Sequence, residues 1–191
     1  MDIKKLYRGC RSYRRFAQEP VSSDDLMQIM ENARIASCSR NSQTVRYVVV
    51  TSSDIVDRMQ PLVHWAASLP QELGTPKKGE QPTAFITVSC QGKPSAMNYI
   101  DMGIAVNTIA TSAWARGIGS CIMGAIDTAA IRDLLQIPDD QELKLVIALG
   151  KPSHRSTIVE IPEDGSKTYY LDEERNYYVP KLSMEEIARF I

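Results

Sequence analysis

The sequence lacks several features that would assign it to a common class of protein. No apolar run approaches the roughly 18 residues that a membrane-spanning helix needs, and no apolar segment follows its polar first residues, so we expect no signal peptide. Its two histidines and four cysteines form no CxxC or similar pattern, which argues against a structural zinc site. We expect the cysteines to be free thiols, namely Cys10, Cys38, Cys90 and Cys121. Free thiols are typical of a reducing compartment, so we expect the protein in the cytoplasm.

An excess of either charge is also missing, since 22 basic and 23 acidic residues leave a net charge of −1. This balance gives no general attraction to nucleic acid or to an anionic membrane. No GxGxxG follows a strand pattern, which disfavours a Rossmann fold. The 191 residues, 43% of them hydrophobic, fit a single domain over residues 1–191, with a core in 1–150 and a C-terminal arm with a short helix in 151–191.

The pattern of apolar residues predicts a layered structure of helices and strands. Continuous β-branched runs predict buried strands at residues 45–51, 83–89 and 143–149. Helical spacing and capping residues predict helices at residues 2–10, 22–36, 53–67, 95–116, 127–137 and 183–191. Residues 69–82, with three prolines, predict a long exposed loop. Tyrosine-rich segments at 169–171 and 177–179 flank an acidic turn and predict a hairpin or an extended arm.

The basic stretch at residues 11–16, Arg-Ser-Tyr-Arg-Arg-Phe, is the first candidate for a binding site. Arg11 and Arg14 are three residues apart, so a helical turn would place them on one face with Ser12 beside them. A planar guanidinium matches two phosphate oxygens at once, and a hydroxyl adds a further donor. The stretch therefore suits a terminal phosphate, and the alternative is a solvated basic surface patch.

Two further segments have compositions that favour ligand binding. Residues 37–43 form a loop of small and amide-bearing side chains, which can hydrogen-bond a polar heterocycle, although an ordinary connector has a similar composition. Residues 117–124 contain three glycines, which let backbone N–H groups come close to a ligand. The alternative for this second segment is simple turn chemistry.

Taken together, three stretches resemble the nitroreductase-like flavoprotein family. Residues 11–16 with Glu19-Pro20-Val21 resemble its opening motif, R-S-x-R-x-F/Y followed by P-V. Residues 33–47 are similar to A-R-x-A-P-S-x-x-N-x-Q-P-W-R/H-F. Residues 101–120 are similar to D-x-G followed by A-x-x-x-G-L/I-G-S/T. These motifs span nearly the whole chain in the right order, and residues 168–187 resemble the C-terminal arm of some members.

This resemblance implies an α+β fold with a mixed, mostly antiparallel sheet wrapped by helices, and a C-terminal arm that extends onto the partner subunit. It also implies FMN, bound without covalent attachment at the interface of an intertwined homodimer. The phosphate would be held by Arg11, Ser12 and Arg14. The flavin of the partner subunit would be reached by Ser37, Cys38, Ser39 and Asn41. The backbone near flavin N5 and O4 would be that of Met123 and Gly124, and a late cation for the phosphate would be Lys181.

The implied activity is that of an oxidoreductase. NADH or NADPH would reduce the FMN, leave, and be replaced by a nitroaromatic, a quinone or a similar electron-poor acceptor, in a ping-pong mechanism. The flavin carries this chemistry, so no catalytic side chain and no metal are expected. The alternatives are a family relative with another flavin-based reaction, such as dehalogenation or flavin breakdown, and a non-catalytic FMN-binding protein. An anion-binding module for nucleic acid is disfavoured by the near-zero net charge.

Overall fold

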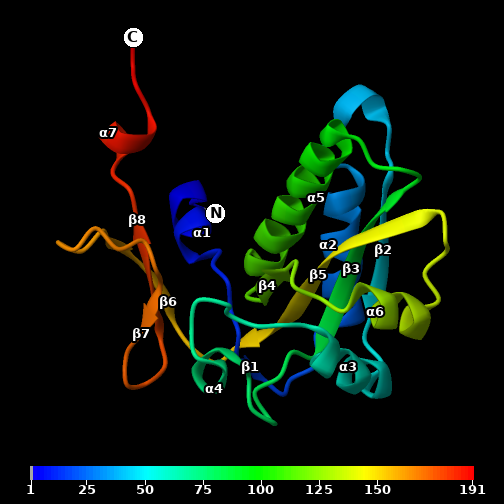
Figure 1. Cartoon of the computed structure of the whole chain (residues 1–191), viewed down its shortest axis with the longest axis horizontal. Coiled ribbons are helices and arrows are strands. Elements are labelled where there is room, and N and C mark those ends of the chain that lie inside the picture. Colours follow the sequence, from blue (N-terminus) through cyan, green and yellow to red (C-terminus); the bar gives the residue numbers. More distant parts are fainter. Residues whose placement is uncertain (1) are drawn as a thin grey trace.

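A five-stranded sheet lies at the centre of the computed structural model, which describes residues 2–191 (Figure 1). Its strands are β1 Phe16–Ala17, β2 Val45–Val50, β3 Ala84–Gln91, β4 Gly119–Met123 and β5 Gln141–Pro152. They are ordered β1-β5-β3-β2, with β4 also paired to β5, and each pairing is antiparallel. The three predicted strands are present as β2, β3 and β5. The predicted α+β fold with a mostly antiparallel sheet is therefore confirmed.

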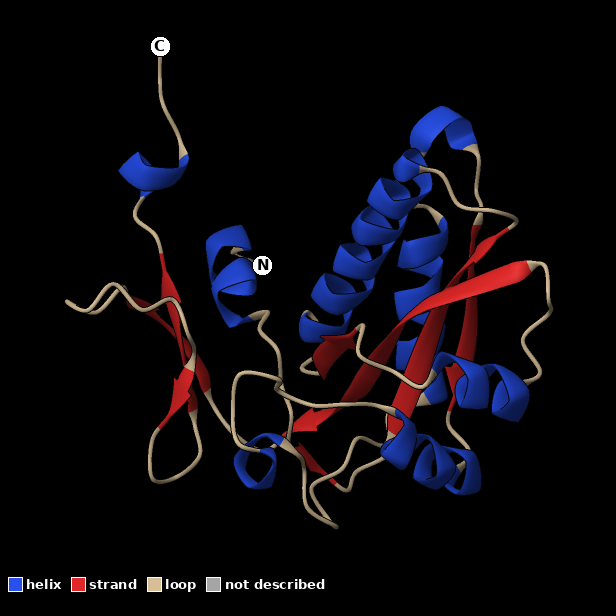
Figure 2. Cartoon of the chain, in the orientation of Figure 1, coloured by secondary structure: helices blue, strands red, loops and turns tan. Residues whose placement is uncertain are grey.

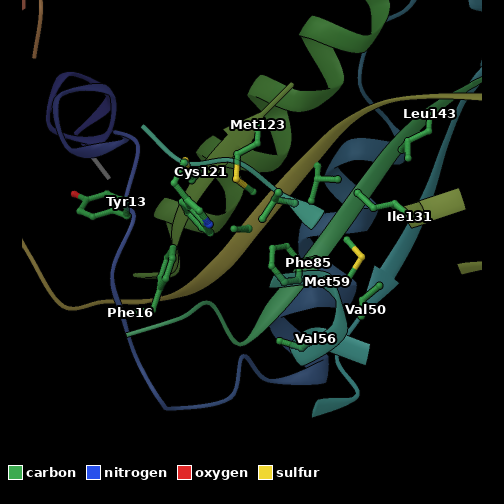
Figure 3. Close-up of a cluster of buried hydrophobic side chains, with 14 of the residues drawn as sticks. Tyr13, Phe16, Val50, Val56, Met59, Phe85, Cys121, Met123, Ile131 and Leu143 are labelled. Atoms are coloured by element: carbon green, nitrogen blue, oxygen red, sulfur yellow. The ribbon is translucent and has the colours of Figure 1, made fainter. Parts of the chain in front are cut away.

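Helices cover both faces of this sheet (Figure 2). One face carries α2 Ser23–Arg34 and α5 Ala96–Trp114, and the other carries α3 Ser53–Met59 and α6 Thr128–Leu135. Successive strand residues point to opposite faces, so Ile147 of β5 packs under α2 and α5 while Val146 packs with Phe85, Met59 and Ile131 on the other side (Figure 3). Within residues 2–191, no helix is both long and apolar enough to cross a membrane.

The helices begin at the residues whose side chains can cap them. The Ser22 hydroxyl accepts a hydrogen bond from the Asp25 N–H at the start of α2, and the Asp127 carboxylate accepts one from the Ala130 N–H at the start of α6. Ser95 begins α5 with a capping box that includes Asn98. These bonds satisfy N–H groups that have no partner inside the helix. The predicted starts of these three helices are therefore confirmed.

Three expected elements differ from the structure. The helix expected at 53–67 ends as α3 at Met59 and continues only as the 3-10 turn Gln60–Leu62, because Pro61 has no N–H to continue the ladder. The loop expected at 69–82 contains the short helix α4 Gln71–Gly74 and buries two of its prolines. The glycine-rich segment at 117–124, for which turn chemistry was the alternative to ligand contact, is largely the strand β4, in which a side chain at Gly119 would collide with Tyr13 and Pro152.

The C-terminal residues form an arm beside the core, at the left of Figure 1. The arm has a three-stranded sheet ordered β6-β8-β7, built from β6 Ser156–Glu160, β7 Tyr170–Leu171 and β8 Tyr177–Lys181. The antiparallel pairing of β7 with β8 confirms the predicted hairpin. The helix α1 Ile3–Gly9 lies between this sheet and α5 (Figure 1). The last helix, α7 Met184–Ile187, ends four residues before the expected Ile191.

Candidate functional site

The basic stretch leaves α1 as an extended segment that runs along β4. Ser12 forms a parallel bridge with Ser120, and the Tyr13 N–H donates to the Ser120 carbonyl at 2.8 Å. The expected helical turn is therefore wrong, because a strand takes up the backbone hydrogen bonds of this stretch. In an extended segment, residues three apart point to opposite sides. Arg11 and Arg14 consequently have different surroundings.

Arg11 and Ser12 line one pocket of about 160 Å³. Cys10, Asn107, Ala110, Ser120 and Ile122 complete its lining. One nitrogen of Arg11, Nη2, donates to the Tyr7 carbonyl at 2.9 Å, whereas the buried Nε of Arg11 has no partner. A buried donor without a partner costs free energy that an anionic acceptor would recover. The Ser12 hydroxyl is exposed at the same pocket, so the residues present fit a phosphate group.

Arg14 faces the arm and does not line this pocket. Its guanidinium carbon lies 4.7 Å from the ring centroid of Tyr169 and 4.8 Å from that of Tyr177, within the range of cation–π attraction. Its backbone N–H donates to Nε2 of His154 at 3.0 Å. The structure therefore separates Arg14 from the other two residues that were predicted to hold a phosphate.

His154 joins the basic stretch to the arm as a neutral side chain. Burial lowers the pKa of His154 to about 4, and the positive charges of Arg15 and Arg14 add to this effect. Its Nδ1 lies 2.9 Å from the Arg155 carbonyl, which assigns the proton to Nδ1 and leaves Nε2 free to accept from Arg14. At neutral pH this imidazole is therefore an acceptor for the basic stretch and not a further cation.

An ionic cluster fixes the turn of the arm to the core. Arg175 donates to both carboxylate oxygens of Glu80, at 3.0 and 3.1 Å. Arg15 lies 3.8 Å from the same carboxylate and also donates to the Arg175 carbonyl at 2.6 Å. The third arginine of the basic stretch thus binds the arm, as Arg14 does. Only Arg11 of the three is directed to the pocket.

The strand β4 leads from this pocket to the predicted flavin-ring residues. Ser120 and Ile122 lie on one face of β4, while Cys121 and Met123 point into the core from the other. Met123 is buried, so only its backbone could contact a ligand. Gly124 follows, exposed, and a strand rises about 3.3 Å per residue, so it lies on the order of 13 Å from Ser120. The strand could therefore contact a ligand with a phosphate at one end and a flat ring at the other.

The loop at residues 37–43 lines a separate pocket of about 300 Å³ between α2, α5 and β2, and Ser37 and Cys38 are part of its lining. Asp101 and Ala105 of α5 also line this pocket, whereas Ala110 of α5 lines the pocket of Arg11. Asp101 and Ala110 are nine residues apart, about two and a half turns, so they lie on opposite sides of the helix. One chain therefore does not bring Ser37, Cys38, Ser39 and Asn41 together with Arg11 and Ser12.

Lys181 lies in the arm and lines neither of the two pockets. It is the exposed last residue of β8 and pairs in register with Glu160 of β6. Three other polar residues line the two pockets, namely Ser120, Asn107 and Asp101. Asp101 and Ser120 stood in the third family motif without an assigned role, and Asn107 was missed by the sequence reasoning. The available signal was their polarity within otherwise apolar elements, since Asp101 is an acidic residue on the buried side of a largely apolar helix.

Comparison with known proteins gives a consistent result. A family model described as the Nitroreductase family matches residues 7–151. A curated relative from Archaeoglobus fulgidus, provisionally named NADH dehydrogenase/NAD(P)H nitroreductase, is 26% identical over 166 residues, 83% of this chain and 89% of the relative. A nitroreductase family protein from Clostridium difficile 630 has a TM-score of 0.69 at 19% identity, covering 100% of this chain and 98% of that one. An FMN-dependent nitroreductase from Clostridium difficile R20291 has a TM-score of 0.67 at 18% identity, covering 81% and 90%.

Proposed function

The chain belongs to the nitroreductase family of oxidoreductases, and from that premise we propose that it uses FMN to pass hydride from NADH or NADPH to small electron-poor acceptors. Quinones and nitroaromatics are the acceptor classes that we propose. The observation that carries this proposal is the pocket of Arg11 and Ser12, where a buried guanidinium N–H has no partner beside a free hydroxyl. That pair suits a phosphate monoester such as the one that ends FMN.

The chain's own residues would bind and orient the cofactor, and FMN supplies the hydride-transfer chemistry when it is bound. Arg11 and Ser12 would hold the phosphate directly. Arg14, which packs against the rings of Tyr169 and Tyr177, would add positive potential rather than a direct contact. The exposed Ile122 would provide an apolar wall that excludes water. Gly124 has no side chain to keep a flat ring away from the backbone, which would leave a backbone N–H free to orient the ring.

The pocket offers no side chain suited to acid–base or nucleophilic chemistry of its own. Burial raises the pKa of the Cys10 thiol, although the nearby Arg11 guanidinium opposes this, so the thiol stays protonated at neutral pH. Arginine keeps its proton throughout the physiological range. This composition supports a site that binds and orients a cofactor.

We propose further that a second copy of the chain completes each site. Because the loop at 37–43 and the pocket of Arg11 lie on opposite sides of α5, the loop that covers a bound ring would come from the partner. α5 also carries an exposed apolar stripe at helical spacing, formed by Met97, Ile100 and Ile104. Such a stripe supports a two-fold interface between copies. Lys181 would approach the phosphate from the arm, and the four free thiols suit a reducing cytoplasm.

The proposed function is tested on the purified protein. The bound chromophore released on denaturation should be FMN and not FAD. Anaerobic addition of NADH or NADPH should remove its visible absorbance, and a quinone or nitroaromatic should restore it. Steady-state lines at varied acceptor should be parallel, since both substrates would use one site in turn. Intersecting lines would contradict the shared site, and a chromophore that neither nicotinamide bleaches would favour the non-catalytic FMN-binding alternative.

A further inference from the structure

The loop between α2 and β2 has an uncommon backbone. Arg40, Asn41 and Gln43 have φ angles of 53°, 53° and 47°, in the left-handed region, and none of them is glycine. An L-residue in this region costs on the order of 1 kcal/mol, somewhat less for asparagine. Backbone conformations of this kind persist only where surrounding groups hold them, and they gather at functional sites. A group outside the loop must therefore hold this backbone in place.

Asp101, on α5, is that group. Its Oδ1 accepts a hydrogen bond from the Ser39 N–H at 2.8 Å, and its Oδ2 accepts one from the Ser42 hydroxyl at 3.4 Å. The side chain is only 3% exposed. Both hydrogen bonds that this carboxylate accepts thus come from the loop. The loop and the carboxylate are more than fifty residues apart in the sequence.

In the part of the chain that the structure describes, no positively charged side chain offsets the free-energy cost of burying the Asp101 carboxylate. Among residues 2–191, it is the only buried acidic side chain, and no arginine, lysine or histidine forms an ion pair with it. A buried carboxylate is costly unless hydrogen bonds satisfy it. A small apolar residue would fill this place on α5 without that cost. The loop contacts are therefore what the carboxylate supplies.

Smaller contacts close the loop around this anchor. The Gln43 N–H donates to the Cys38 sulfur at 3.4 Å, and Asn98 of α5 donates to the Thr44 hydroxyl at 2.9 Å. The side chains of Arg40 and Asn41 stay exposed. The loop thus has a fixed backbone and free polar side chains, which is the arrangement expected of a binding wall.

We propose that Asp101 is a positioning residue that holds residues 38–43 in one conformation, so that the loop forms a rigid wall against the flavin of the partner subunit. The second half of this statement rests on the proposed function. A preorganised loop binds more tightly because its ordering cost is met during folding and not during binding. Loss of the anchor should therefore weaken flavin binding without removing any group that touches the flavin.

The conformation of the loop can be tested without flavin, by trypsin cleavage after Arg40. This exposed arginine makes the Arg40–Asn41 bond a trypsin site inside the loop. In flavin-free protein, Asp101→Ala should raise the initial rate of cleavage at this bond about tenfold or more, because proteolysis follows the population of the opened loop. Asp101→Asn keeps one acceptor for the Ser39 N–H, and its amide can donate to Ser42, so it should stay within about twofold of the unaltered protein.

Two further variants separate positioning from general stability. Val106→Ala, a buried change on the same helix, should lower the melting temperature and leave cleavage at Arg40 unchanged. Ser39→Pro removes the N–H donor together with the Ser39 hydroxyl, so its result is taken from the flavin-free cleavage assay alone. Cys38, at φ −142° and ψ 155°, already has the extended backbone that precedes a proline. Ser39→Pro should therefore reproduce the effect of Asp101→Ala, and it carries the test if Asp101→Ala does not fold.

Flavin titration completes the experiment. Asp101→Ala should raise the Kd for FMN about tenfold, while Val106→Ala and Asp101→Asn should not. Unchanged cleavage in both anchor variants would overturn the proposal, and so would increased cleavage with unchanged FMN affinity, or a Val106→Ala variant that reproduces both changes. If the unaltered protein binds no FMN, the proposed function fails, and that failure is distinct because the cleavage assay uses no flavin.

Discussion

The basic stretch at 11–16 and the loop at 37–43 were both assigned to one cofactor, but the fold holds them in different ways. The basic stretch is fixed through its backbone, since the Tyr13 N–H donates to the carbonyl of Ser120 in β4. The loop is fixed through side chains, above all the carboxylate of Asp101. A segment held by its backbone keeps its shape when a side chain changes. Substitutions in the basic stretch should thus remove single contacts, whereas substitutions at the loop's anchor should change its shape.

The largest expected effect is the pH dependence of the free energy of unfolding, through His154, which accepts a hydrogen bond from the backbone of the basic stretch. The pKa of His154 is about 4 in the folded protein, below its ordinary value of 6.5, so the unfolded chain binds the proton more readily. The contribution of His154 to the free energy of unfolding should therefore be complete above pH 6.5. It should decrease by about 3 kcal/mol as the pH falls to 4. Urea unfolding across this window measures the loss.

The control for this prediction is His154→Gln, which cannot be protonated. It should remove most of the pH dependence between 6.5 and 4, while the carboxylates still titrate at lower pH. If the variant and the unaltered protein lose stability in parallel across this window, His154 is not the buried neutral acceptor that we describe for the backbone of Arg14.

The second effect in size distinguishes the two arginines. Arg11→Ala should weaken FMN binding on the order of 10–150-fold, because a charge-assisted hydrogen bond contributes roughly 1.5–3 kcal/mol. Arg14→Ala should weaken it less, since the Arg14 guanidinium packs against two arm tyrosines and does not line the pocket. The exposed Arg58 of α3 supplies the control, as Arg58→Ala removes one positive charge that lines neither pocket. Unchanged flavin affinity in both Arg11→Ala and Arg14→Ala would rule out the phosphate site.

The smallest effect is expected at the arm. Lys181→Ala should lower FMN affinity a few-fold and leave the dimer intact, because it removes one exposed charge and little packing area. Flavin titration and sedimentation of the same sample measure both quantities. A variant that becomes monomeric would mean that Lys181 contributes to the interface rather than to the phosphate.

Much of the fold could be read from local patterns, and the failures have a common physical cause. β2, β3 and β5 follow from β-branched runs, because such residues suit a buried sheet. β4 could not be predicted in this way, because Gly119 and Ser120 are typical of turns and form a strand only through pairing with β5. The expected turn at Arg11 failed for the same reason, since Ser120 lies more than a hundred residues away.

The candidate site was predictable to a similar extent. Arg11 and Ser12 do share a pocket, as their chemistry suggested. The position of Arg14 depends on Tyr169 and Tyr177, and the shape of the loop depends on Asp101, so both are set by contacts between distant parts of the chain. No local spacing rule contains that information.

The central claim, that each flavin site combines the basic stretch of one chain with the loop of its partner, can be tested directly with mixed dimers. One chain carries Arg11→Ala and the other carries Asp101→Ala, with different affinity tags for purification. FMN is supplied at a concentration that saturates the unaltered protein but neither variant homodimer. We predict that the mixed dimer fills one of its two sites, because one site then has both unaltered segments and the other has both changes. A mixed dimer that binds no more FMN than the variant homodimers would contradict the account, because each site would then draw both segments from a single chain.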